Sequence, residues 1–486
     1  MRMDVNARQI LNLFEQISAI PRCSKQEAGI SRWLQDWGRS RGLKTVSDSA
    51  GNVVMRIPPT PGFETLPGVV LQSHMDMVCE KLPETDHDFT RDPIRLIYDG
   101  DWLKADRTTL GADNGIGMAI ALALAADATL RHPPLELLFT VDEETGLTGA
   151  QRLSPEMIQG RILINLDSED EGIFTVGCAG GMDTHIRIPV ERERTAANDC
   201  LYGVIRVRGL QGGHSGIDIH RQRANAVSLA VRALAACRKH GQIQLISLKG
   251  GKAHNAIPRD CRAVVACMRG DAGLLQECIA VFAETVKNEY AASEPDLRIV
   301  IDFQNDGQSG NCPLTPGATD RVIALLLALP HGVSRRSASD SGIVETSNNL
   351  AVAELHNDEL VAVTSQRSSI MSLRDALTRK IEAIAFLAGG RVENVNGYPS
   401  WQPNMQSSLL ARSRTVYQEI FFQPPRIEEI HAGLECGIIG AKFTGMDMIS
   451  IGPTMKCPHS PSERLFIPSV EKVWRFLAAL LESYGK

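Results

Sequence analysis

Residues Pro67–Asp76 read PGVVLQSHMD, an apolar run of strand length that is closed by a histidine and an aspartate. Because side chains alternate along an extended chain, His74 and Asp76 project to the same side of the predicted strand. The histidine can bind a metal ion there while the aspartate accepts the second ring N–H and fixes the tautomer. Alone the motif is a weak signal, since such a pair at a strand end is usually solvated or bonded to a neighbouring loop.

A second candidate ligand stands in LGADNGIG, residues 110–117, directly before the helix-forming run MAIALALAAD. The structural alternative makes Asp113 or Asn114 the N-cap of that helix, and for Asn114 this alternative weighs as much as a functional role. Asp113 follows a glycine-containing turn and is free to point elsewhere. Its two carboxylate oxygens suit it to bridge two cations.

Two further apolar runs end in acidic residues. LELLFTV at 135–141 leads into Asp142-Glu143-Glu144, and RILINL at 161–166 leads into Asp167. Three consecutive carboxylates at the end of a buried strand repel one another without a cation, although a solvated loop is the structural alternative. Strands that each end in a ligand-type residue place those residues along one edge of a sheet, where open α/β folds hold their sites.

The last candidate ligand lies near the other end of the chain. DMISIG at 447–452 predicts a short strand, and the loop after it carries His459, which alone would be an ordinary loop histidine. The five residues together are stronger evidence for a metal site than any one of them alone, because three carboxylates and two histidines suit two divalent cations. Two dications exceed three carboxylates by one positive charge, and such a site lowers the pKa of its water towards about 7. Glu143, beside a ligand but not needed as one, is then the natural general base.

Six segments closely resemble the aminoacyl-histidine dipeptidases, also called peptidase D or Xaa-His dipeptidases: LQSHMDMV, TTLGADNGIG, DEETG, INLDSEDEG, HAGLECG and SIGPTMKCPHSP. These enzymes belong to the two-zinc exopeptidases, with carnosinases, carboxypeptidases and aminoacylases. The resemblance covers essentially the whole chain. It implies two zinc ions per chain, one held by His74, Asp113 and Asp167 and the other by Asp113, Glu144 and His459. It also implies that Asp76 orients the first histidine and that Glu143 is the general base.

Composition fits a soluble cytoplasmic enzyme of 486 residues with 43% hydrophobic residues, enough for two cores. A formal charge of −6 without a long basic run argues against a nucleic-acid partner. The first residues are not expected to act as a signal peptide, and no apolar stretch reaches membrane-spanning length. Eleven cysteines without CxxC pairs predict mostly buried, reduced thiols, with Cys79 near the site as an oxidation-sensitive exception.

The ligands also show how the chain is divided. Four precede residue 170 and the fifth is His459, so an inserted lid must interrupt the catalytic domain. ERERTAAND at 191–199 is the predicted exit and YPSWQPN at 398–404 the predicted return, which gives a catalytic domain of 1–190 and 401–486 and a lid of 191–400. We therefore predict an α/β catalytic domain, a mixed sheet flanked by helices. The lid should be α+β, with doubled ferredoxin-like βαββαβ units.

Periodicity places the elements of the lid and of the C-terminal part. The predicted lid strands are 201–208, 242–248, 261–268 and 297–303, and the predicted helices are 222–239, 272–291, 318–329 and 372–388. Two more helices are expected at 407–420 and 470–483.

Three lid segments and one later loop are candidates for substrate binding. Each alone is more typical of a structural or surface role, and only the resemblance raises them. It implies that His214 stabilises the oxyanion, on its own site or on a partner subunit's, and that Asn255 and Arg367 hold the substrate, Arg367 by its C-terminal carboxylate. The backbone at Gly433 is expected to approach the substrate closely.

We therefore expect a metallopeptidase that hydrolyses unblocked dipeptides, including carnosine-like Xaa-His substrates, by a water bridging two zinc ions. Manganese or cobalt would also suit the oxygen-rich ligands. The alternatives are an N-acyl amino acid deacylase with the same centre and a metal-dependent peptide-binding protein without turnover; the intact Glu143 counts against the latter. The expected partner is a small peptide, and a homodimer is left open. The chain has no GxSxG elbow and no P-loop.

Overall fold

The computed structural model describes residues 5–193, 200–304, 312–338 and 342–485. It divides into two compact units. Unit 1 contains the described residues up to Cys178, Trp401–Glu429 and those from Leu434 on, and unit 2 contains Ala179–Ser400 and Ile430–Gly433. Each unit has its own hydrophobic core, as the predicted insertion requires.

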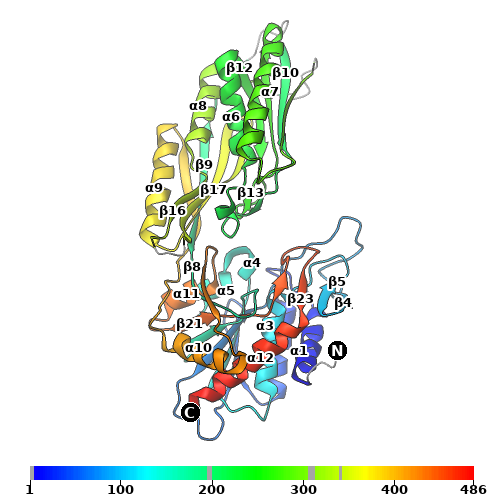
Figure 1. Cartoon of the computed structure of the whole chain (residues 1–486), viewed down its shortest axis with the longest axis vertical. Coiled ribbons are helices and arrows are strands. Elements are labelled where there is room, and N and C mark those ends of the chain that lie inside the picture. Colours follow the sequence, from blue (N-terminus) through cyan, green and yellow to red (C-terminus); the bar gives the residue numbers. More distant parts are fainter. Residues whose placement is uncertain (1–4, 194–199, 305–311, 339–341, 486) are drawn as a thin grey trace. The chain divides into compact units, whose positions relative to one another are not determined.

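Unit 1 is built on an eight-stranded mixed sheet (Figure 1). In spatial order its strands are β1 (Lys44–Ser47), β2 (Val53–Ile57), β6 (Leu135–Thr140), β3 (Val69–His74), β7 (Ile162–Asn165), β21 (Asp447–Ser450), β8 (Ile173–Cys178) and β20 (Arg426–Ile430). The central strands β6, β3, β7 and β21 run parallel. Strands β2 and β8 pair antiparallel with the outer members of this group, and β1 pairs antiparallel with β2. Every residue of β3 and β6 is buried, which explains why neither sequence alternates apolar and polar residues.

Helices cover this sheet. They are α1 (Val5–Ser18), α2 (Ala28–Ser40), α3 (Ala112–Ala126), α10 (Ser408–Phe421), α11 (Glu435–Lys442) and α12 (Ile467–Glu482), with the short α4 (Glu143–Gly146) and α5 (Thr148–Arg152). Helix α3 packs against β3, α1 and α12, and it is apolar on all sides because it lies inside the unit. A small sheet joins β4 (Leu96–Asp99), β5 (Trp102–Ala105), β23 (Arg464–Phe466) and β22 (Met455–Lys456).

Unit 2 contains one long antiparallel sheet. In spatial order its strands are β15 (Arg298–Gln304), β10 (Cys200–Arg208), β14 (Cys261–Met268), β12 (Ile243–Gly250), β17 (Val344–Leu355), β18 (Glu359–Ser368), β9 (Gly180–Pro189) and β19 (Arg391–Tyr398), and β16 (Gly332–Arg336) pairs with β17. The helices are α6 (Ala226–His240), α7 (Ala272–Glu289), α8 (Pro316–Ala328) and α9 (Met371–Leu387). They contact one another in the order α7, α6, α8, α9 and form a layer on the sheet (Figure 1).

The sheet of unit 2 consists of two ferredoxin-like βαββαβ motifs, one nested in the other. The inner motif is β10-α6-β12-β14-α7-β15, and the outer one is β9-α8-β17-β18-α9-β19. In both motifs the spatial strand order is fourth, first, third, second. The motifs join where β12 meets β17, at Lys249–Glu354 and Gly250–Ala353. The predicted doubling is confirmed, but the motifs are nested and do not follow one another along the chain.

The nested arrangement also determines at which residue the chain passes from unit 1 to unit 2. Strand β9 is the first strand of the outer motif, so the packing changes at Cys178. The sequence boundary at residue 190 stays a prediction, and of the predicted exit at 191–199, residues 194–199 lie outside the described part. None of the helices in the described residues combines the length and the apolar character needed to cross a membrane.

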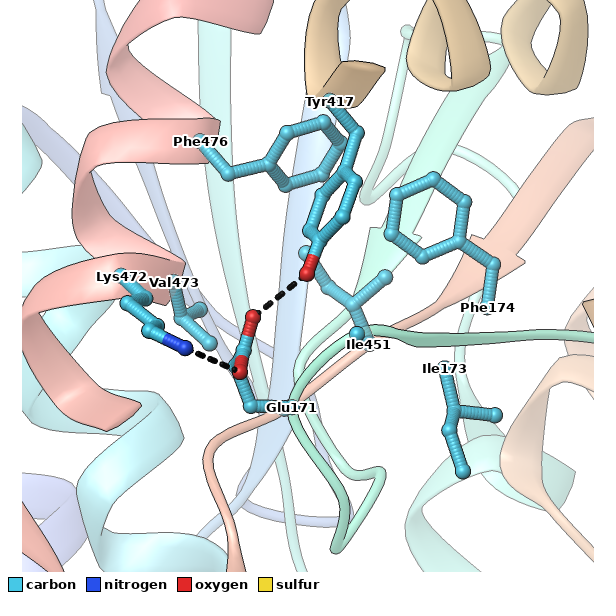
Figure 2. Close-up of a pocket in the computed structure, with 10 residues that line it drawn as sticks. Glu171, Ile173, Phe174, Tyr417, Ile451, Lys472, Val473 and Phe476 are labelled. Carbon is cyan, nitrogen blue, oxygen red and sulfur yellow. Dashed lines mark hydrogen bonds and ion pairs between the residues drawn. The ribbon is translucent and has the colours of Figure 1, made fainter. Parts of the chain in front are cut away.

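A partly exposed ion pair and a tyrosine hydrogen bond fix the loop that follows β7. The Glu171 carboxylate accepts a 2.6 Å hydrogen bond from the Tyr417 hydroxyl of α10 and lies 3.1 Å from Nζ of Lys472 in α12 (Figure 2). These residues line a small cavity with Phe174 and Phe476, whose rings also contact each other. The loop that begins at Asp167 is therefore held by two helices of the C-terminal part of the chain.

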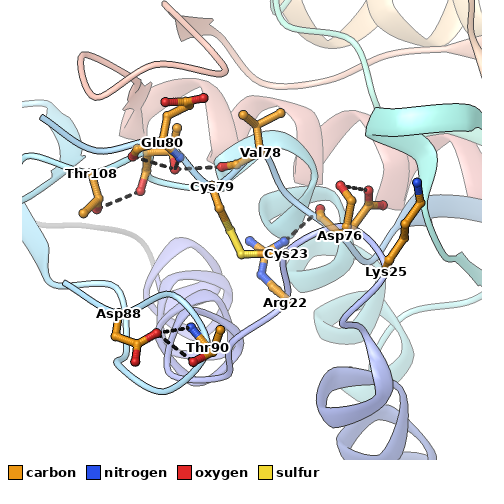
Figure 3. The surroundings of a disulfide bond; sticks show 12 residues. Arg22, Cys23, Lys25, Asp76, Val78, Cys79, Glu80, Asp88, Thr90 and Thr108 are labelled. Atoms are coloured by element: carbon orange, nitrogen blue, oxygen red, sulfur yellow. Dashed lines mark hydrogen bonds between the residues drawn. A yellow bond between two sulfur atoms is a disulfide. The ribbon is translucent and has the colours of Figure 1, made fainter. Parts of the chain in front are cut away.

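A disulfide joins Cys23 to Cys79 in unit 1, and the other nine cysteines, all of them described, form no disulfide (Figure 3). Cys79 is the cysteine that was expected to be sensitive to oxidation, but its partner Cys23 was not predicted, because spacing alone does not reveal that the two segments lie side by side. Cys23 follows Arg22 and precedes Ser24, which donates a 2.8 Å hydrogen bond to the Asp76 carboxylate. The bond thus ties the segment after α1 to the loop after β3.

Reduction of this disulfide is expected to destabilise unit 1. The bond closes a loop with a sequence separation of 56 residues, so its loss should lower the free energy of unfolding by about 2–4 kcal/mol. Thermal unfolding with and without a phosphine reductant measures the effect. The double variant Cys23→Ser/Cys79→Ser is the control and should melt at the reduced protein's temperature in both buffers. Equal melting temperatures for the oxidised and reduced wild type would contradict the prediction.

Candidate metal centre

Three neighbouring parallel strands bring most of the predicted ligands together. His74 is the last residue of β3, Glu143 and Glu144 begin α4 after β6, and Asp167 follows β7. In the sheet β3 lies between β6 and β7, and His74 is paired with Thr140 at the end of β6. Because the carboxyl ends of parallel strands meet at one edge, all four side chains come from the same edge of the sheet.

Asp113 lies between two groups of ligand-type atoms. Its Oδ1 is 2.9 Å from Nε2 of His74, and its Oδ2 is 2.9 Å from Nε2 of His459. On the first side Oδ1 of Asp167 lies 3.3 Å from the His74 ring nitrogen, and on the second Oε2 of Glu144 lies 3.1 Å from the His459 nitrogen. The five predicted ligands therefore form two groups that share one carboxylate, which is the arrangement expected of a bridging aspartate.

Local backbone structure explains why Asp113 points into this cluster. Although Asp113 and Asn114 fall within the bounds of α3, both have non-helical dihedral angles, and Gly111 has φ +67°. A Cβ at Gly111 would lie 2.6 Å from the Arg22 guanidinium and 2.7 Å from the Met77 sulfur, so only glycine fits. The N-cap hypothesis for Asn114 is wrong: its amide donates to the carbonyl of Leu166 at 2.8 Å and to the Asp167 carboxylate.

Asp76 is fully buried and holds two of the site's segments at once. The His74 Nδ1 lies 3.1 Å from the Asp76 backbone carbonyl and 3.4 Å from its carboxylate. The same carboxylate accepts the backbone N–H groups of Glu143 at 2.9 Å and of Glu144 at 3.1 Å. The sequence predicted the contact with the histidine but not the contact with the α4 turn.

Burial and mutual repulsion dominate the electrostatics of the cluster. Burial, and next the carboxylate of Asp113, raise the pKa of Glu144 to about 7. Burial also raises the pKa of Glu143 well above its usual value, against the opposing influence of His74. Burial lowers the pKa of the His459 ring, but Asp113 and Glu144 outweigh it and raise that pKa. So many acidic groups in one buried place need positive charge near them.

The donor set fits a pair of divalent cations. Ligand atoms of His74, Asp113 and Glu144 all lie within 4.8 Å of one another. One oxygen of Glu144, Oε1, is buried and has no hydrogen-bond partner among the described residues. Imidazole nitrogens with carboxylate oxygens are ligands typical of zinc, and of manganese or cobalt where oxygen predominates. The ligand roles of the five residues stay predictions.

The other four predicted site residues belong to unit 2, where they lie in one cluster. The Ser215 backbone N–H, next to His214, donates to the Asn255 carbonyl at 2.8 Å. Arg367 is buried; its Nη1 donates to the Tyr398 hydroxyl at 2.7 Å and its Nη2 lies 3.4 Å from Oγ of Ser215. A Cβ at Gly433 would lie 2.7 Å from the Tyr398 ring. Gly433 thus approaches a tyrosine of its own unit closely.

Sequence reasoning missed three buried residues beside the metal cluster. Glu463 accepts backbone N–H groups from the turn that carries Asp113. Arg22 donates to carbonyls of that turn and of the segment after β3. Glu435 accepts from Gln72 at 2.6 Å and from Thr140 at 2.7 Å, while its other oxygen is buried without a partner among the described residues. Only Glu435 had a sequence signal, its place in HAGLECG.

Comparisons with known proteins place this geometry in a family. The model of peptidase family M28 matches residues 52–178, and the peptidase dimerisation domain matches residues 205–294. The cytosol non-specific dipeptidase of Escherichia coli is 40% identical over 98% of both chains. The solved structure of aminoacylhistidine dipeptidase from Vibrio alginolyticus has a TM-score of 0.82 and 39% identity, covering 98% of this chain and 96% of that one.

A more distant structure shares only the fold. The aminopeptidase PepT of Bacillus cereus has a TM-score of 0.56 at 16% identity, over 99% of both chains. The identity of 40% to the E. coli dipeptidase shows more than the fold, because the match spans 98% of both chains. The chain belongs to the family of metallopeptidases that includes the cytosol non-specific dipeptidase of E. coli and the aminoacylhistidine dipeptidase of V. alginolyticus.

Proposed function

We propose that this chain hydrolyses unblocked dipeptides, Xaa-His dipeptides among them, at a centre of two zinc ions. One observation carries the proposal: each oxygen of Asp113 faces a different histidine at 2.9 Å. A shared carboxylate between two groups of ligands is what a two-metal hydrolase needs. The names of the two family members add support, since both are dipeptidases.

In this proposal His74, Asp113 and Asp167 hold one ion, and Asp113, Glu144 and His459 hold the other. Asp76 orients His74 and the α4 turn, and its two hydrogen bonds to that turn favour the role. When bound, the cations lower the pKa of a water molecule and polarise the peptide carbonyl. Manganese or cobalt would supply the same chemistry through the same ligands.

Glu143 is the proposed general base. Its backbone N–H donates to Asp76, and its half-buried side chain lies beside the cluster without being needed as a ligand. Burial raises the pKa of this carboxyl well above its usual value, although His74 opposes the shift. A raised pKa suits a group that takes a proton from the attacking water and delivers it to the leaving amine.

Four residues of unit 2 are proposed to bind the substrate. Nδ1 of His214 accepts the backbone N–H groups of Gly216 at 3.3 Å and Ile217 at 3.0 Å. A neutral His214 ring therefore carries its proton on Nε2, the tautomer that donates to an oxyanion. Asn255 and the Gly433 backbone are proposed to contact the dipeptide.

Arg367 is the proposed partner of the substrate's C-terminal carboxylate. Its Nε is buried and has no hydrogen-bond partner among the described residues, so the guanidinium has donor capacity left. Arg374, also buried, is different, because its donors bond the carbonyls of Gly181 and Tyr398 and the carboxylate of Asp375. A planar guanidinium with unused donors suits bidentate binding of a carboxylate.

The carboxylate assignment predicts how substrates are ranked. Amidation of Ala-His at its C-terminus should lower kcat/KM about 10²-fold in the wild type, because a buried donor then loses its charged partner. In Arg367→Ala the two substrates should differ little. Steady-state kinetics on the matched pair measures both effects, and Arg374→Ala is the control that should keep the wild-type preference. An undiminished preference in Arg367→Ala would remove Arg367 from carboxylate binding.

The amine end distinguishes the dipeptidase from a deacylase with the same centre. A site with several acidic groups favours a free ammonium, so Ala-His should be hydrolysed much faster than N-acetyl-histidine. Product detection for this pair is sufficient, with metal content measured on the same sample. A higher kcat/KM for N-acetyl-histidine would make the chain a deacylase.

A homodimer is also proposed. Residues 205–294 match the peptidase dimerisation domain, and exposed apolar side chains such as Leu274 and Val281 lie on α7 within that range. Light scattering should give twice the mass of one chain.

The cytoplasmic location is supported by the printed name of the E. coli relative. The Cys23–Cys79 disulfide is the feature that argues against it, since such bonds are rare in reducing compartments.

A further inference from the structure

Glu463 is a buried glutamate whose carboxylate accepts hydrogen bonds from the turn at residues 110–113, where α3 begins. Its Oε2 accepts the backbone N–H groups of Leu110 at 2.7 Å and Gly111 at 3.0 Å. Its Oε1 accepts those of Ala112 at 2.8 Å and Asp113 at 3.4 Å. Four consecutive N–H groups thus point at one side chain that lies about 350 residues away along the sequence, and the last of them belongs to Asp113.

The carbonyl side of the same turn is held by a buried cation. The Arg22 guanidinium donates to the Gly111 carbonyl, and through Nη1 to the carbonyls of Met75 and Asp76, both at 3.1 Å. Burial lowers the pKa of Arg22 to about 10, with Glu463 as the strongest opposing influence, so this group stays charged at neutral pH. The turn is therefore fixed between a carboxylate on its N–H side and a guanidinium on its carbonyl side.

These contacts connect the three segments that hold the first histidine, the shared aspartate and the second histidine. Arg22 joins the Asp113 turn to the end of the β3 segment, which carries His74. Glu463 lies four residues after His459, and its backbone N–H donates to the Ser460 carbonyl at 3.0 Å. The loop between β22 and β23 therefore meets Asp113 twice, once through His459 and once through Glu463.

We propose that Glu463 is a positioning residue of the metal centre: it fixes the Asp113 turn so that each aspartate oxygen faces one histidine. The inference rests on the proposed function only in taking Asp113 as the shared ligand. A carboxylate accepts hydrogen bonds only, whereas the amide of glutamine presents two donors at one end. Glu463→Gln therefore turns an N–H donor towards backbone N–H groups, and the turn must move.

The test measures metal binding independently of turnover. Glu463→Gln should bind both metals about 10–100-fold more weakly in competition with a chelator, as expected when a group that orients a ligand is lost. The visible absorption spectrum of the cobalt-loaded protein should change, because Asp113 then meets the cations differently. Raising the free metal concentration should restore part of the lost kcat, with KM little changed.

Glu136→Gln is the matched control. Glu136 is a buried glutamate of β6 in the same unit, which accepts the backbone N–H groups of Gln159 at 2.7 Å and Gly160 at 2.8 Å and pairs with Arg56. Its replacement removes a comparable buried acceptor without touching the Asp113 turn. We expect a lower melting temperature but wild-type metal affinity and cobalt spectrum.

Glu463→Asp keeps the inference testable if the glutamine variant does not fold. Aspartate retains the charge on a shorter side chain, so it should recover part of the metal affinity and an intermediate spectrum. Wild-type metal affinity and spectrum in a folded Glu463 variant would overturn the inference, as would an equal loss in Glu136→Gln. A wild type that binds two metals but hydrolyses no dipeptide would instead refute the proposed function and leave the role of Glu463 intact.

Discussion

Asp113→Ala is expected to disturb both metal sites at once and to lower kcat/KM for Ala-His by about 10³-fold or more, because each cation loses a ligand. The reason is geometric. Oδ1 faces His74 and Oδ2 faces His459 at the same distance of 2.9 Å. Removal of the Asp113 carboxylate therefore takes a ligand from both groups. Metal analysis after dialysis against a weak chelator should find fewer than two ions per chain, with both sites weakened together.

Asp76→Ala is the comparison for this variant. It removes a side chain that holds His74 and the Glu143–Glu144 backbone but is not a proposed ligand. Its metal loss should be smaller than that of Asp113→Ala, although activity falls. If Asp113→Ala retains two metals with unchanged affinity, the bridging role is wrong and the two groups of ligands must be assigned again.

Glu143→Gln is expected to separate metal binding from catalysis. The amide has nearly the size of the carboxylate but cannot accept a proton from water, so kcat should fall by about 10²-fold or more. Roughly two metals per chain should remain, because none of the proposed ligands is changed. Metal analysis and single-turnover kinetics on one preparation measure the two properties. Near-normal turnover with both metals retained would exclude Glu143 as the base.

Three of the proposed ligands could be located along the sequence because each stands at the end of an apolar run. His74, Glu144 and Asp167 follow apolar runs that form neighbouring buried strands, and the structure brings them together at one edge. Most helices of unit 2 were also visible as apolar periodicity, such as α7 at Ala272–Glu289 against the predicted 272–291. Patterns of this kind depend on which face of an element is buried. The spacing of apolar residues within that one segment of sequence indicates this face.

Other features depend on contacts between distant segments. Glu463 meets the Asp113 turn across about 350 residues, and nothing in the sequence around it indicates four N–H donors. Asn114 has the local preference of an N-cap, but its contact with Asp167 outweighs that preference. The β9 segment looks like any strand, so its membership in the second sheet became visible only through its pairing with β18.

Nesting has a consequence for synthesis of the chain on the ribosome. Strand β9 ends at Pro189, whereas its partner β18 begins only at Glu359. At about 5–20 residues per second, β9 waits roughly 10–30 s with both edges unpaired, while the inner βαββαβ motif can already fold. Exposed strand edges invite pairing with other chains, and charged side chains within a strand discourage it. Asp183 and Arg187 in β9 would protect the nascent chain from aggregation during that interval.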